Sequence, residues 1–301
     1  MVSYGVRGVN SFCWRTSPSN LGRRTSSQSF ESGCGAMLGY GLLLSNSRMT
    51  TRLANVFSTV SSNVERRLFL EYGAIFATTA MPPPKIIFPD GVEVERFQSS
   101  LALRRGRIGD HEIELQAQAM DALLRAVSKI ELRGGRITAR AADAGGRSYQ
   151  DTVGLWVRNV TRGLEHWESV GLISKDDAQL IKDLSPVDQV EVILDLEETR
   201  QLFFGTFFDK SILYSVAAPG SSQHLSLLAF DVAEYEDSEV ERVLGLHGWH
   251  RTVPNDLPHF TYLGHKREML VDLGLTRVTR RYDLSSYSFY VPDMDSLEET
   301  G

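Results

Sequence analysis

Two short stretches of this 301-residue chain bring together the residue types that decide its architecture. The first, residues 219–231, has the sequence PGSSQHLSLLAFD, and the second, residues 256–262, has the sequence DLPHFTY. Apolar runs of this length, bounded by turns such as the proline-glycine pair of the first stretch, are typical of buried strands. We therefore expect strands at Leu225–Val232 and His259–Leu263, each with a histidine at or near its beginning.

Around these stretches, the C-terminal half of the chain contains further strand-like segments, whereas the N-terminal half has the apolar periodicity of helices. Helical spacing or capping residues predict helices at 112–130, at 149–169, after Ser174, from Pro186 to about Gln201, and from Asp237 to Gly248. Further strands are expected at Arg136–Arg140, Ser211–Ala217 and Tyr287–Val291, and residues 62–80 are expected to be a helix or a strand. Helices followed by a strand-rich half predict an α+β fold, with a small antiparallel sheet packed with helices and preceded by a helical region.

The composition is that of a globular protein, with 42% hydrophobic and 23% charged residues. A chain of this length buries roughly 75% of its unfolded surface and needs no disulfides to be stable. Lys and Arg number 32 against 38 Asp and Glu, a net charge of −6, so we expect no nucleic-acid partner. Both cysteines, Cys13 and Cys34, lie within the first sixty residues. The chain beyond residue 60 therefore has no disulfide and no thiolate metal site.

The first sixty residues differ from the rest, with six Arg, eleven Ser and a single acidic residue. This composition is typical of a targeting segment or a disordered arm, so residues 1–61 are expected to be one or the other. An export signal and a later start codon, at Met37 or Met49, remain open alternatives. The apolar run at 36–44 is too short to span a bilayer, and no transmembrane span is expected. Beyond residue 61, we expect a helical region at 62–130, a core domain at 131–292 and an acidic tail at 293–301.

His224, Asp231 and His259 offer two imidazoles and a carboxylate, a ligand set that suits Zn²⁺ and leaves a fourth position open for water. Asp256 precedes His259 by three residues and is close enough to act on that water as a general base. His224 and Asp231 are seven residues apart, which would place them on opposite faces of a flat strand. The metal site therefore requires a turn or bulge near Ser226. The alternative is a site without metal, in which Asp231 begins an acidic loop and His259 packs beside its neighbours.

The segment from Ser215 to Gly264 resembles the zinc core of the VanY-type D-alanyl-D-alanine carboxypeptidases, a group that includes the VanX dipeptidases. Their pattern is Ser-x-His-x-x-Gly-x-Ala-x-Asp, then Gly-Trp or Gly-Phe, then Glu-x-x-His. The residues that match are Ser222, His224, Ala229, Asp231, Gly248-Trp249 and His259, and Arg147-Ser148-Tyr149 resembles the family's Tyr-Arg-Ser segment. The resemblance covers residues 135–265.

The resemblance implies a metallopeptidase with one Zn²⁺ per chain, held by His224, Asp231 and His259. Asp256 stands where the family has its catalytic glutamate. The implied partner is a peptidoglycan stem peptide or another D-Ala-terminated peptide, cleaved as a carboxypeptidase or an endopeptidase would cleave it. Such a substrate implies a protein of the cell envelope or periplasm, or a secreted one, although the N-terminal sequence contains no convincing signal peptide.

By the same resemblance, Arg147 would stabilise the developing oxyanion or hold a carboxylate, with Arg140 as the competing candidate. Ser222 would help to seat the substrate carboxylate. Two positions depart from the family pattern: Asp256 replaces glutamate, and Leu227 replaces glycine. These departures leave a second hypothesis open, a catalytically impaired VanY-like module that binds wall peptide or a protein partner without cleaving it.

Overall fold

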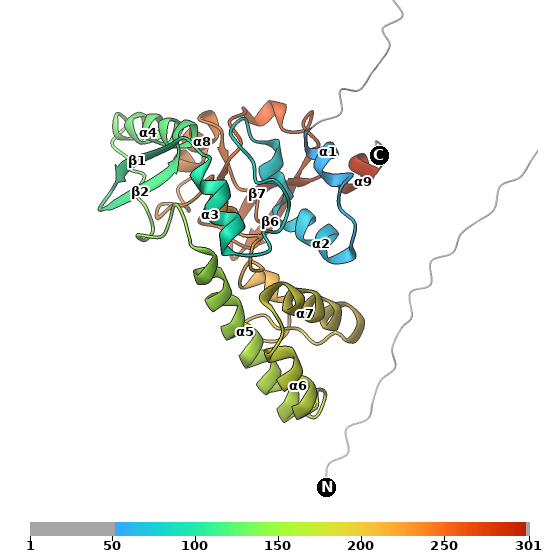
Figure 1. The fold of residues 1–301 in the computed structure, drawn as a ribbon. Helices are drawn as coiled ribbons and strands as arrows, with labels where there is room; N and C mark the ends of the chain where they lie inside the picture. Colours follow the sequence, from blue (N-terminus) through green and yellow to red (C-terminus); the bar gives the residue numbers. More distant parts are fainter. Residues whose placement is uncertain (1–51, 299–301) are drawn as a thin grey trace, which may run out of the picture. The chain divides into compact units, whose positions relative to one another are not determined.

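The computed structural model describes residues 52–298, which form an α+β fold, as the sequence predicted (Figure 1). Both cysteines, the apolar run at 36–44 and most of the expected arm lie outside the described residues. Helix α1, Arg52–Phe57, falls within that expected arm, and its Leu53 is fully buried in the core. The folded part of the chain therefore includes residues that we expected to be an arm.

A three-stranded antiparallel sheet carries the residues of the two stretches quoted above. Its order is β3-β5-β4, with β3 at Ala229–Asp231, β5 at His259–Tyr262 and β4 at Trp249–His250. Strand β5 lies in the centre and pairs with both neighbours. The strand expected at 259–263 is thus confirmed, and the one expected at 225–232 is confirmed only for its last residues.

Alternation along these strands gives the sheet two unlike faces. Phe230 lies opposite Phe260, and Trp249 lies opposite Tyr262, so one face is aromatic. The intervening pairs, Asp231 with His259 and Ala229 with Thr261, project from the other face. The aromatic face is packed into the main hydrophobic core, whereas the opposite face carries polar side chains.

Two antiparallel hairpins flank this sheet in the chain order, β1–β2 at Leu103–Ile108 and His111–Gln116, and β6–β7 at Leu275–Tyr282 and Ser285–Pro292. The other helices are α2 (Asn63–Tyr72), α3 (Gly91–Ser99), α4 (Ala117–Glu131), α5 (Tyr149–Ser169), α6 (Lys175–Lys182), α7 (Pro186–Arg200), α8 (Ser238–Leu246) and α9 (Met294–Glu298). Short 3-10 turns lie at η1 (Gly73–Ala77), η2 (Ile212–Tyr214), η3 (Gln223–Ser226) and η4 (Arg267–Met269). Helix α4 packs on the β1–β2 hairpin and on α8, and α8 packs on β4.

The predicted starts of helices α5 to α8 are confirmed, because side chains cap them as the sequence indicates. Ser148 accepts a hydrogen bond from the backbone N–H of Asp151 in a complete capping box at α5. Ser174, Ser185 and Asp237 cap α6, α7 and α8 in the same manner, and Pro186 occupies the first position of α7. The beginnings of these helices could therefore be predicted from neighbouring residues alone.

The single helix expected at 112–130 is wrong at its beginning. Residues 111–116 form strand β2, and the helix begins only at Ala117. Ile113 and Leu115 are two residues apart, which fits one face of a strand as well as a helical stripe. Gly109, with a φ of 62°, closes the hairpin with β1 and decides in favour of the strand.

The strand expected at 211–217 is also wrong, because Ser211 caps the 3-10 turn η2 instead. Residues 136–140 form only an isolated bridge, between Ala139 and Val232. The strand expected near 287–291 is present as β7, but its partner β6 and helix α3 were not anticipated. The expected acidic tail includes α9, whose Leu297 is buried.

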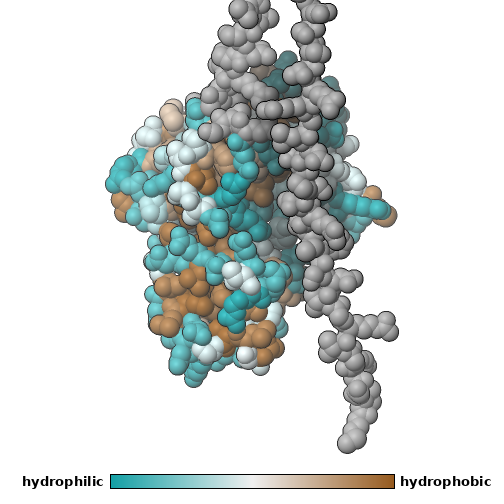
Figure 2. Space-filling model, turned by 90° about the vertical axis from the view of Figure 1, so that its right-hand side faces the viewer, coloured by the Kyte–Doolittle hydropathy of each residue, from teal (hydrophilic) through white to brown (hydrophobic). Residues whose placement is uncertain are grey.

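Helices α5, α6 and α7 lie together at one end of the described fold (Figure 1). Figure 2 shows apolar residues on the surface of this helical part, at the bottom of the view. The exposed apolar side chains of these helices and of the adjoining loops include Val157, Val170, Leu172, Leu180 and Phe207. None of the helices within residues 52–298 is long and apolar enough to cross a membrane.

Candidate metal centre

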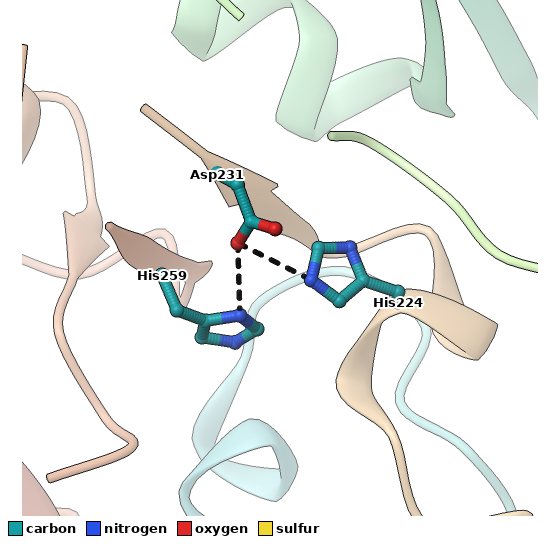
Figure 3. A group of neighbouring side chains, drawn as sticks. All are labelled: His224, Asp231 and His259. Carbon is teal, nitrogen blue, oxygen red and sulfur yellow. Dashed lines mark ion pairs between the residues drawn. The ribbon is translucent and has the colours of Figure 1, made fainter. Parts of the chain in front are cut away.

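His224, Asp231 and His259 converge as the sequence predicted, with one potential ligand atom from each lying within 4.8 Å of the others (Figure 3). Asp231 Oδ1 lies at the centre of the group, 3.3 Å from His224 Nε2 and 3.3 Å from His259 Nδ1. Ligands bound to zinc at about 2.0–2.1 Å on a tetrahedron lie roughly 3.3 Å from one another. The two distances from Asp231 are therefore those expected between ligand atoms around one ion.

Strand register brings two of the three side chains together. Asp231 and His259 are direct partners across the β3–β5 pair, so their side chains project from the same face of the sheet. Asp231 is also held from the other edge of β3, where its backbone N–H donates to the carbonyl of Ala144 and its carbonyl accepts from the N–H of Arg140. The backbone of Asp231 is thus fixed on both sides.

His224 reaches the same place from a different element. It lies in the 3-10 turn η3, and the expected change of direction near Ser226 is present. Leu227 ends the turn with a φ of 54°, the left-handed conformation that glycine adopts freely. A leucine in this conformation costs roughly 1–2 kcal/mol. The turn therefore keeps a backbone suited to glycine, and the Leu227 side chain is buried against Gly146 instead of lining the cleft.

Polar atoms at the centre of this group have no hydrogen-bond partner within the described residues. They are both ring nitrogens of His224 and Oδ1 of Asp231, and all three are buried. A buried polar atom without a partner costs about 1–3 kcal/mol, so their convergence calls for a ligand. Two imidazoles and one carboxylate are donors that transition-metal ions bind. The residues present therefore fit a bound metal ion.

The electrostatics of the group favour a charged Asp231 carboxylate and disfavour a charge on the His224 ring. Burial alone would raise the pKa of Asp231, but the interactions with His224 and His259 outweigh it and hold the pKa far below its usual range. Burial lowers the pKa of His224, although Asp231 opposes this shift. Ionised aspartate and neutral histidine are the forms that bind metals.

Arg147 contacts the outer side of the same carboxylate. Its Nη2 donates to Oδ2 of Asp231 at 3.2 Å, and its Nε donates to Oδ2 of Asp143 at 3.3 Å. Oδ2 of Asp231 thus has a partner while Oδ1 points to the two histidines. The arginine therefore orients the carboxylate as well as lining the adjacent cleft.

The group opens into a cleft of about 390 Å³. Its walls include the predicted site residues His224, His259, Asp256, Arg147 and Ser222, together with the last residue of α2, residues of α5 and the segment 213–217. Asp256 is exposed to solvent, and its loop is held by a hydrogen bond from the hydroxyl of Tyr282 to the carbonyl of Pro254.

Arg140 is the predicted residue that lies elsewhere. Its guanidinium group lies 5.9 Å from the centre of the Tyr235 ring, and Arg140 is not among the residues that line the cleft. The bridge between Ala139 and Val232 fixes the direction of the chain here, and Arg147 remains the arginine at the site.

Two further residues at the site, Gln223 and Tyr72, were not predicted from the sequence. Gln223 is buried and hydrogen-bonded to His259, with 2.8 Å between Oε1 and Nε2. Tyr72, at the end of α2, lines the cleft, and burial raises the pKa of its hydroxyl well above the usual value, with Glu71 and Asp256 adding to the shift. Gln223 adjoins His224 in the sequence, but neither the spacing nor the motif gave a signal for its role, and Tyr72 is 152 residues from His224.

Comparisons with known proteins give little direct guidance. No protein-family model matches the chain, and no curated protein matches it. Among solved structures, the LdcB LD-carboxypeptidase, whose structure is described as revealing the molecular basis of peptidoglycan recognition, matches with a TM-score of 0.32. The match has 17% identity and covers 57% of this chain and 72% of the other. Because a likeness of this size does not establish a shared fold, the function has to be inferred from the site itself.

Proposed function

We propose that this protein is a zinc-dependent metallopeptidase that hydrolyses peptides of the bacterial cell wall. The observation that carries the proposal is the convergence of His224, Asp231 and His259, with buried atoms that lack partners, beside a cleft lined by Asp256 and Arg147. Two histidines and a carboxylate with a fourth position open to a cleft are the ligand arrangement of hydrolytic zinc sites. Zn²⁺ bound there would act as a Lewis acid on the scissile carbonyl and would lower the pKa of a water molecule.

Asp256 is the proposed general base. It lines the cleft together with both histidines and is exposed, so a carboxylate can take a proton from water there and return it to the leaving amine. The shorter aspartate side chain, in place of the family's glutamate, has to be brought closer by the backbone of its loop. The hydrogen bond from Tyr282 to Pro254 supports the loop in its position.

Arg147 has two roles in this proposal. Its contact with Oδ2 of Asp231 holds the other oxygen of that carboxylate toward the histidines. Arg147 also lines the cleft, where its remaining donors can stabilise the negative charge that develops on the substrate oxygen. Ser222, on the cleft wall, is proposed to bind the substrate carboxylate.

The substrate class rests on the sequence resemblance to the VanY-type carboxypeptidases. A D-Ala-terminated stem peptide is the proposed substrate, and the cleft volume of about 390 Å³ is within the range of small-ligand sites. Such a substrate implies a protein of the cell envelope. Tyr72, at the end of α2, lines the cleft, so we propose that the N-terminal helical region contributes to the substrate site.

A second candidate function is binding of the same peptides without cleavage. Asp256 in place of glutamate favours it, because catalytic geometry is sensitive to displacements on the order of 1 Å. In this case the metal and the cleft would serve recognition only.

Zinc content per chain is the first test. The wild-type protein is expected to hold about one zinc, and His259→Ala is expected to lose it, since removing one of three ligands opens the site. His247→Ala is the matched control, because His247 is outside the described ligand cluster. Wild-type protein that neither retains nor takes up zinc would contradict the proposal.

Hydrolysis of D-Ala-terminated peptides by the zinc-loaded protein then separates the two candidates. A working peptidase is expected to lose activity by at least about a hundredfold in Asp256→Ala, as is typical for removal of a general base. If the wild-type protein is inactive and Asp256→Glu gains activity, the chain is an impaired enzyme that has kept its binding site.

A further inference from the structure

The buried side chain of Gln223 connects the metal centre to the end of helix α2. Its Nε2 donates to the backbone carbonyl of Tyr72 at 2.9 Å, and its Oε1 lies 2.8 Å from Nε2 of His259. Only 3% of Gln223 is exposed, so water does not compete for these contacts. One amide group thus bridges two segments that are far apart in the sequence.

The surroundings of Gln223 allow only one orientation of its amide group. The carbonyl of Tyr72 can only accept, so the NH₂ of Gln223 has to face it. At the other end, the hydroxyls of Thr252 and Thr261 are placed to donate to Oε1. An inverted amide would set one carbonyl oxygen against another, which is why the oxygen of Gln223 must point to His259.

This orientation determines where His259 carries a proton. Because the oxygen of Gln223 accepts, the ring nitrogen that faces it, Nε2, has to be the protonated one. The other nitrogen, Nδ1, then presents its lone pair to the position between His224 and Asp231. A partner that accepts from the remote nitrogen of a metal-binding histidine also raises the basicity of the nitrogen that binds.

We propose that Gln223 is a positioning residue that fixes Nδ1 of His259 as the metal-binding atom. This inference rests on the metal site of the proposed function and adds to it the residue that selects the ligand atom. The two histidines are then unequal, because Nδ1 of His224 has no such partner within residues 52–298. His259 is the ligand whose geometry is fixed before the metal arrives.

Two substitutions of Gln223 separate this role from a merely structural one. Gln223→Leu removes the acceptor for His259 and is expected to weaken zinc binding by about 10–100-fold. Gln223→Glu keeps an oxygen that accepts from Nε2 but replaces the donor to Tyr72 with a carboxylate oxygen. Where the fold is intact, its zinc affinity is expected to stay within a few-fold of the wild type. Affinity is measured by competition with a coloured chelator, with the fold of each variant checked by circular dichroism.

Gln189→Leu is the matched control. Gln189 is also 3% exposed, and its Nε2 donates to the carbonyl of Ile181 at 3.0 Å, but it lies on α7. Its substitution removes a buried amide without touching the metal centre, so zinc affinity should not change. Equal affinities in Gln223→Leu and Gln189→Leu would overturn the proposal, as would a low affinity in Gln223→Glu with the fold intact.

Nitrogen NMR of labelled histidine gives a readout that does not depend on activity. In the zinc-loaded wild type, His259 is expected to show a protected proton on Nε2 and a metal-shifted Nδ1. The protected proton is expected in the metal-free wild type as well, and its absence from both forms would refute the role of Gln223. If zinc does not bind at all, the proposed function fails, while the Nε2 proton still shows whether Gln223 orients His259.

Discussion

The two faces of the β3-β5-β4 sheet use the same strands for opposite purposes. On one face, Trp249 packs against Tyr262 and Phe230, with 5.4 Å and 6.3 Å between ring centres. On the other face, Asp231 and His259 have their ligand atoms turned toward one another without hydrogen bonding between them. Burial of the aromatic face stabilises the sheet, whereas the buried polar atoms without partners on the other face destabilise it. The first contribution offsets the second. The candidate site therefore depends on a sheet that is stabilised by the side chains of its opposite face.

The largest effect is expected on the aromatic face. Phe260 is fully buried between β3 and β4, and Phe260→Ala is expected to lower the free energy of unfolding by about 3–5 kcal/mol, as cavities of this size do. Urea unfolding of the metal-free protein measures it. Phe207, 82% exposed, provides the control, since Phe207→Ala should change stability by no more than about 0.5 kcal/mol. Similar small losses for both variants would remove the distinction between the faces.

A smaller effect is expected from His250, which lies on the polar side of β4 but away from the ligands. Burial lowers its pKa to about 4, despite the hydrogen bond from its Nε2 to the carbonyl of His265, while Arg267 lowers the pKa and Glu241 raises it. Between this value and the ordinary 6.5, the unfolded chain binds a proton that the folded protein does not. Stability should therefore be fully present above about pH 6.5 and should be lost as the pH falls toward 4.

The size of this loss follows from about 1.4 kcal/mol per pKa unit, which gives roughly 2 kcal/mol between about pH 7 and about pH 5. Urea unfolding at the two pH values measures it in wild type and in His250→Gln, which keeps a donor but does not titrate. The variant is expected to show a loss smaller by that amount. An equal pH dependence in both proteins would assign the acid sensitivity to other groups.

The smallest effect is expected when a ligand is replaced by an apolar side chain in the metal-free protein. His224→Leu removes two buried nitrogens that lack partners and fills their volume, so stability without zinc should stay the same or rise by up to about 1 kcal/mol. Thermal unfolding with a chelator tests this, and the same scan with zinc should show stabilisation of the wild type alone. A marked destabilisation of the metal-free variant would mean that His224 has a structural role on the polar face.

Local sequence signals predicted the candidate metal ligands and the starts of helices α5 to α8. The histidines and Asp231 are visible because their residue types are rare in apolar runs, and the caps at Ser148, Ser174 and Ser185 act within one turn. In each case the deciding interaction lies within a few residues or a recognisable motif. These features needed no knowledge of the tertiary structure.

Features that depend on contacts between distant segments could not be predicted from the local sequence. Strand β6 has an exposed face with Arg277 and Arg281, so it lacks the apolar pattern of a buried strand, and only its pairing with β7 makes it one. The choice between Arg140 and Arg147 depends on how residues 138–144 cross the edge of β3. The role of Gln223 depends on a carbonyl at Tyr72, which nothing in its own neighbourhood indicates.

The direct pairing of Asp231 with His259 also has a consequence for the fidelity of folding. A slip of β3 by one residue against β5 would turn Phe230 toward the cleft and Asp231 into the core, while β5 would keep its pairing with β4. Exposing an aromatic side chain and burying a carboxylate in the core are both unfavourable. The incorrect register is therefore disfavoured before any metal is bound. Side chains that do not contact the metal thus determine the strand register, and with it the position of the atoms that would hold the metal.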